Sequence, residues 1–127
     1  MRLAATRAAV LAAMRAGGSL APARCRATKP DTITTPIAWI DTVSLGGPVK
    51  TLDGRVSITA TVIVVTDGTN DAATNALDDY TDEIAAQLVE AGLALQSVEP
   101  VPPLELDAPA RRLAARITVT GISTLRS

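Results

Sequence analysis

Residues 53–92 hold the two strongest periodic patterns of the chain, one directly after the other: DGRVSITATVIVVTDGTNDAATNALDDYTDEIAAQLVEAG. In the first half, apolar residues alternate from Val56 to Val64, which predicts a strand with one apolar face. The opposite face begins polar but ends with Ile63 and Val65. We therefore expect the far end of this strand to be covered on both faces.

The second half of the stretch predicts a long amphipathic helix. Gly68 permits a turn, and Thr69 or Asn70 can then cap a helix that starts near Asp71. Gly92 favours the end of the helix, because glycine adopts the left-handed conformation that follows a last turn. Apolar residues recur at steps of three and four: Ala73, Leu77, Tyr80, Ile84, Leu88 and Ala91. We expect this stripe to pack on the apolar face of the strand.

The remaining segments complete a fold of the α+β class. An Ala-rich helix is expected over residues 2–16, an extended linker over 17–36, and strands over 37–45, 93–98 and 112–122. The pattern of residues 37–45 leaves its buried face open. The order α-β-β-α-β-β predicts a two-layer sandwich, in which an antiparallel sheet of about four strands carries two helices on one side. We expect residues 1–127 to form a single domain, with its core in residues 37–125.

The composition argues against most kinds of active site. The 127 residues include no His, which is the commonest general base and metal ligand. Cys25 is the single cysteine and has no His to activate it, so a thiol that is either buried or idle is expected. No stretch approaches the ~20 apolar residues that a membrane span needs. We therefore expect no enzyme activity, no cofactor and no membrane contact; an enzyme that uses only Asp, Tyr and Lys is the remaining catalytic alternative.

One dense polar cluster lies on the expected helix, and it consists of Asp78, Asp79, Asp82 and Glu83. Neighbours one turn apart could share a cation, but they supply far fewer than the roughly six to eight oxygen ligands of a calcium site. Residues 67–78 also fail as a calcium loop, because their sixth position is Ala72, where glycine is needed. The cluster is therefore predicted to be an acidic surface, and these four residues are candidates for a contact with another subunit.

Charge is sorted along the chain although the net charge is only −1. Residues 1–29 contain six basic residues and no acidic one, whereas residues 67–99 contain eight acidic residues and no basic one. The basic segment could bind nucleic acid, cover the sheet as a solvated helix, or meet the acidic helix of a neighbouring copy. Its composition also fits an organelle transit peptide or a weak secretory signal. Because the chain has so few aromatic residues, we favour a role without nucleic-acid binding.

The order of these elements resembles that of the tail terminator proteins of long-tailed phages that infect actinobacteria. The resemblance covers residues 1–122 and is carried by the Arg-started strand from Arg55, the Asp- and Asn-containing turn, the helix ending Val-Glu-Ala-Gly at Gly92, the Pro-rich segment and the last strand. It departs in the longer basic linker over residues 17–29. The resemblance implies a structural protein that forms a hexameric ring, caps the tail tube and joins it to the head-tail connector.

Further expectations follow from the same resemblance. Its partners would be the tail tube protein and the head-tail connector protein, and genomic DNA would pass through the ring without sequence-specific binding. The protein would assemble in the host cytoplasm and reside at the neck end of the virion tail. Strand-connecting arms of this family reach neighbouring subunits or the tube. Residues 46–54 form a loop longer than a tight hairpin needs, so its contact candidates are Val49, Lys50, Thr51 and Leu52.

Two alternatives remain open on the sequence. One is a neighbouring component of the phage neck, a head-to-tail connector or stopper. The other is a stand-alone bacterial domain that binds a small molecule.

Overall fold

The computed structural model of the protein describes residues 2–16, 18–31, 33–48, 55–68, 70–101 and 112–124. The helical elements are α1 (Arg2–Met14), the 3-10 helix η1 (Pro22–Arg24) and α2 (Asp71–Glu90). The strands are β1 (Cys25–Arg26), β2 (Ile37–Pro48), β3 (Arg55–Asp67), β4 (Ala94–Pro100) and β5 (Arg112–Thr124).

The strands form one sheet in the order β1-β2-β3-β5-β4. β1 pairs with β2 in parallel, and the other three pairings are antiparallel. The α+β class is therefore confirmed. The prediction of an antiparallel sheet of about four strands is matched only roughly: β2, β3, β5 and β4 pair antiparallel, but β1 adds a fifth, parallel strand and makes the sheet mixed. β1 is two residues long and lies inside the predicted linker, and so short a strand leaves no periodic pattern.

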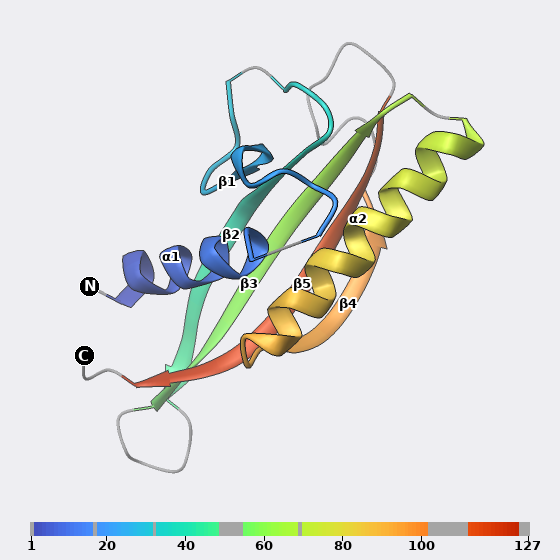
Figure 1. Cartoon of the computed structure of the whole chain (residues 1–127). Coiled ribbons are helices and arrows are strands. Elements are labelled where there is room, and N and C mark those ends of the chain that lie inside the picture. Colours follow the sequence, from blue (N-terminus) through green and yellow to red (C-terminus); the bar gives the residue numbers. More distant parts are fainter. Residues whose placement is uncertain are drawn as a thin grey trace.

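Both helices pack on the same face of the sheet (Figure 1). Their buried residues share one core cluster with alternate residues of β2, β3 and β5. The main members are Val10, Met14, Ala38, Ile40, Ala60, Val62, Val64, Leu77, Ile84, Leu88, Ile117 and Val119. The predicted packing of the α2 stripe on β3 is thus confirmed, with half-buried Tyr80 against the cluster. Ala91 is exposed because α2 ends at Glu90, and Thr81 and Ala85 are buried instead.

A second apolar cluster lies on the opposite face of the sheet. It contains Ile37, Trp39, Ile63, Val65, Val101 and Ala114, with Ile33 packed against it. The prediction that the far end of β3 is covered on both faces is therefore confirmed.

A β-bulge explains why the buried face of β2 could not be assigned from its sequence. Ile40 pairs with Val62, but the next pair is Thr42 with Thr61, so Asp41 is an extra residue. An extra residue reverses which positions face the helices. Ala38 and Ile40 lie in the helix-side cluster before the bulge, and Val43 packs against the same cluster after it.

The ends of α2 follow the predicted signals. The Asn70 side chain accepts a hydrogen bond from the Ala73 N–H at 2.8 Å, so Asn70 is the cap. At the other end, Gly92 has a φ of 98°, and the N–H groups of Leu93 and Gly92 donate to the carbonyls of Leu88 and Val89 at 3.1 and 3.0 Å. These paired hydrogen bonds define a Schellman motif, in which glycine is favoured because its φ is positive.

Several predicted boundaries move in the structure. The loop predicted to start at Gly46 starts later, because β2 continues to Pro48 through a register irregularity after Leu45. β4 continues to Pro100, two residues past the predicted end of the strand at residue 98; proline is tolerated there because β4 is an edge strand of the described sheet. α1 ends at Met14 rather than at residue 16, and β5 extends to Thr124.

Candidate interaction surface on α2 and β4

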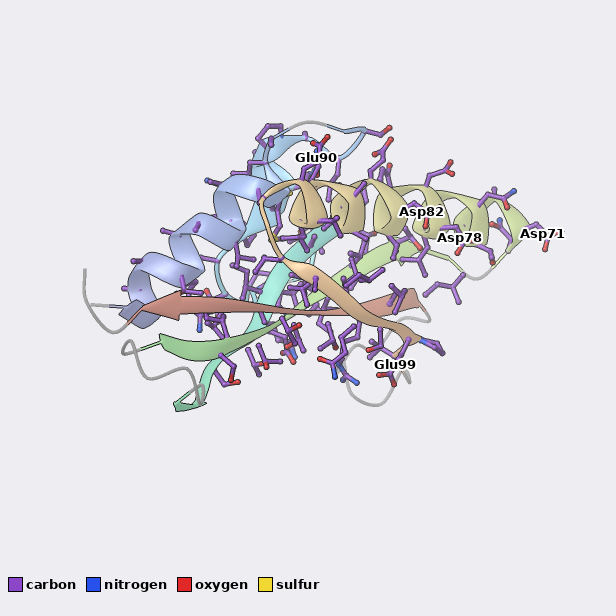
Figure 2. All side chains as sticks on the ribbon, turned by 90° about the horizontal axis from the view of Figure 1, so that it is seen from below. Asp71, Asp78, Asp82, Glu90 and Glu99 are labelled. Atoms are coloured by element: carbon purple, nitrogen blue, oxygen red, sulfur yellow. The ribbon has the colours of Figure 1, made fainter. Side chains whose placement is uncertain are left out.

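The four acidic candidates of α2 do not lie together, because neighbouring positions of a helix point about 100° apart. Asp78 and Asp82 are one turn apart, and Val89 lies seven positions after Asp82 on the same flank. Figure 2 shows Asp78 and Asp82 on the side of α2 beside which β4 runs. Asp79 is exposed and lies farther around the helix, away from β4.

Glu83 lies on the other flank of α2 and binds the segment that follows α1. Its carboxylate accepts a hydrogen bond from the Ser19 N–H at 2.7 Å and one from the Ser19 hydroxyl at 2.9 Å. Gly18, with a φ of 92°, allows this approach, because a Cβ there would lie 3.0 Å from Glu83 Oε2. Of the four predicted acidic candidates, Asp78 and Asp82 share the β4 flank, whereas Glu83 has an intramolecular partner.

β4 forms one end of the sheet and presents apolar side chains beside α2. Leu95 pairs with Val119 and Val98 pairs with Ile117, and both partners belong to the helix-side core. Directly paired residues of antiparallel strands point to the same face, so Leu95 and Val98 point to the helix side. They remain 47% and 46% exposed, so α2 covers them only in part.

We define the α2/β4 surface as Val89, Leu95 and Val98 together with Asp78 and Asp82. Val89 is 48% exposed, and these three are the large apolar side chains of the described residues that stay exposed. An apolar centre with charged residues at its border is the usual composition of a protein–protein contact. Figure 2 places Glu90 on the far side of α2 and Glu99 below the sheet, so both lie outside this surface.

A second, basic surface lies at the opposite end of the sheet. We define the basic edge as Ala21, η1 with its last residue Arg24, and Arg26 of β1. None of the three η1 residues is buried, and Ala21 and Arg26 are exposed. Because β1 and β4 are the two outermost strands, the charge sorting seen along the sequence becomes a sorting across the sheet.

Two arginines of α1 hold the basic segment in place. Arg15 donates two hydrogen bonds to the Cys25 carbonyl, at 3.1 and 2.7 Å, and Arg7 donates one to the Ala27 carbonyl at 2.9 Å. Cys25 itself is fully buried, as predicted. Burial raises the pKa of the Cys25 thiol above its ordinary value, and the Arg15 charge opposes that rise.

The described residues contain no cluster of side chains suited to hold a metal ion. Their His, Cys, Asp and Glu side chains do not gather in groups of three or more that could hold a metal ion. Neither α1 nor α2 has the length and hydropathy of a membrane-crossing helix over its described residues. The other predicted contact residues, Val49, Lys50, Thr51 and Leu52, lie outside the described residues.

The apolar part of the α2/β4 surface was missed from the sequence. Leu95 and Val98 are three positions apart, which in a regular strand places them on opposite faces. The register shift between Leu95 and Ser97 makes Gln96 an extra residue and brings both onto one face. The signal available in the sequence was weaker: two large apolar residues close to a Pro-rich segment.

The sequence matches no known protein-family model, and no curated protein shows significant similarity to it. Function is therefore inferred from the α2/β4 surface, from the fold and from the resemblance in element order.

Proposed function

We propose that the protein is a structural component of a phage tail, a tail terminator whose copies form a ring that caps the tail tube and joins it to the head connector. The observation that carries this proposal is the placement of two complementary surfaces at opposite ends of one sheet. A protomer that carries both halves of a contact on different sides forms head-to-tail assemblies, which close into a ring where the rotation permits.

The fold and the side-chain chemistry support this function. Helices α1 and α2 pack on one face of the sheet, and β1 and β4 are its outermost described strands. Among the described residues, the large apolar side chains that stay exposed belong to α2 and β4. A subunit that works by contact needs such surfaces and no catalytic group. In this proposal the partners are further copies of the chain, the tail tube protein and the head-tail connector protein, at the neck end of the virion.

The proposal also assigns roles to the other partners. DNA passes through the ring without base recognition, and no cofactor takes part. The connector or stopper alternative makes the same ring but binds the portal side rather than the tube. The tube protein is therefore the partner that separates the two functions.

A mass measurement of the purified protein with and without the tail tube protein tests the function. The expected result is a ring-sized species alone, six copies in negative-stain images, and a larger complex when tube protein is added. Binding to purified portal or connector with no binding to tube would favour the stopper function. A protein that binds neither component in any assembled state would contradict a role in the phage neck.

A further inference from the structure

We propose that neighbouring copies of the chain join edge to edge, with the α2/β4 surface of one copy bound to the basic edge of the next. This inference rests on the ring in the proposed function and deepens it, because it names the two surfaces that meet. It is testable on the protein alone, without any phage component.

The apolar part of the contact comes from both surfaces. Val89, Leu95 and Val98 are each nearly half exposed, which leaves a group of aliphatic side chains in water. On the basic edge, the residues of η1 are unburied, so Pro22 and its alanine neighbours offer a small apolar platform. Burial of these side chains against each other supplies the non-specific part of the attraction.

The charged part determines which surfaces meet. Asp78 and Asp82 border the apolar group on the α2/β4 surface, and the exposed Arg26 lies on the basic edge. Arg24 is half-buried and donates a hydrogen bond to the Thr34 carbonyl at 3.4 Å, which keeps its charge close to the basic edge. Opposite charges steer the correct pairing and raise the association rate, and their effect weakens with salt.

A symmetric contact between two α2/β4 surfaces is disfavoured by the same charges. It would bring Asp78 and Asp82 of one copy close to the same two carboxylates of its partner, and like charges in an interface oppose association. The basic edge has the matching charge, so the contact joins different surfaces.

The backbones of the two edge strands also support a contact made mainly through side chains. β4 is seven residues long and terminates the described sheet, so one side of its backbone is available for pairing. β1 is only two residues long, and its Cys25 carbonyl already accepts hydrogen bonds from Arg15. The neighbour therefore approaches β4 mainly through side chains of the basic edge rather than through a long strand ladder.

A charge-swap experiment tests this contact by sedimentation velocity at low ionic strength. We expect the unmodified chain to assemble, and we expect D78K/D82K and R24E/R26E each to sediment as a 13.1 kDa monomer. An equimolar mixture of the two variants should assemble again, because each mutant surface then faces an opposite charge on the other variant. Circular dichroism of each variant verifies that it is folded.

A matched control separates the contact from a change in total charge. D79K/E90K makes the same change in net charge at two exposed positions of α2 that lie away from β4, so this variant should assemble like the unmodified chain. Normal assembly of R24E/R26E would overturn the inference, because the basic edge would then play no part. A monomer at all concentrations of the unmodified chain would overturn it as well. If the chain assembles as described but does not bind tube or portal, the edge contact stands and the phage function fails.

Discussion

The carboxylate of Glu83 accepts hydrogen bonds from both the backbone N–H and the hydroxyl of Ser19, a residue 64 positions earlier in the chain. This pair joins the middle of α2 to the segment between α1 and η1. It also fixes the flank of α2 that lies away from β4. One carboxylate of the acidic cluster is thereby used within the molecule.

We expect Glu83→Ala to destabilise the protein by about 1 kcal/mol, because two hydrogen bonds to a charged acceptor are lost at an exposed site. The free energy of unfolding in urea measures the loss. Asp79→Ala removes a carboxylate one turn earlier that has no such partner on Ser19, and should change stability by less than about 0.5 kcal/mol. Equal effects of the two substitutions would show that the pair with Ser19 contributes nothing.

The contact between α2 and the sheet gives the largest expected stability effects. Leu88 is fully buried and Ile84 is 2% exposed, both against the inward residues of the sheet. Replacement of either by Ala should cost about 2 to 5 kcal/mol, because transfer free energy is lost and a cavity remains. Val89→Ala is the matched control, since Val89 is the exposed neighbour on the same helix. A loss below about half a kcal/mol for Leu88→Ala would contradict this packing.

The long elements were predictable because each carries many residues of one period. β3, α2 and β5 have uninterrupted patterns, and their buried faces follow from the sequence alone. β2 has an extra residue at Asp41 and a second register shift after Leu45, and β4 has an extra residue at Gln96. Each extra residue reverses the period-two pattern after it. β1 is held by its pairing with β2 and by Arg15, which are both long-range contacts that a local pattern does not contain.

The candidate site, like the fold, was predictable only in part from the sequence. The sequence predicted an acidic helix surface but treated Asp78, Asp79, Asp82 and Glu83 as one group. Only the position of β4 on one flank, and of Ser19 on the other, separates them. The apolar residues of β4 in the α2/β4 surface share a face only because of the strand register, so they could be recognised only from the structure.

The buried thiol of Cys25 should make stability depend on pH at alkaline values. Burial raises the pKa of the Cys25 thiol in the folded state above its ordinary value, which the unfolded thiol keeps. The stabilising effect of the neutral thiol is therefore fully present below the unfolded pKa and is lost as pH rises through the folded pKa. Urea unfolding at pH 7.5 and at pH values above 9 measures the change, with Cys25→Ala as the control.

Other groups titrate in the same pH range. The informative quantity is therefore the difference in the free energy of unfolding between the unmodified chain and Cys25→Ala. That difference should shrink as pH rises, because only the unmodified chain loses the contribution of the thiol. A difference that stays constant across this range would show that the thiol ionises equally in both states. Reaction of Cys25 with a thiol reagent should also be slow in the folded protein and fast in urea, since the side chain is fully buried.

The apolar and charged parts of the α2/β4 surface should respond differently to salt. Leu95 and Val98 are about half exposed in one copy, so Leu95→Ala with Val98→Ala should change the stability of the monomer little. Assembly should weaken by about tenfold or more, because apolar residues at the centre of a contact carry much of its free energy. Salt screens Asp78 and Asp82 but leaves aliphatic burial intact, so the defect of the double Ala variant should persist at all salt concentrations. Sedimentation at two ionic strengths measures both effects, and a variant that assembles normally would remove Leu95 and Val98 from the interface.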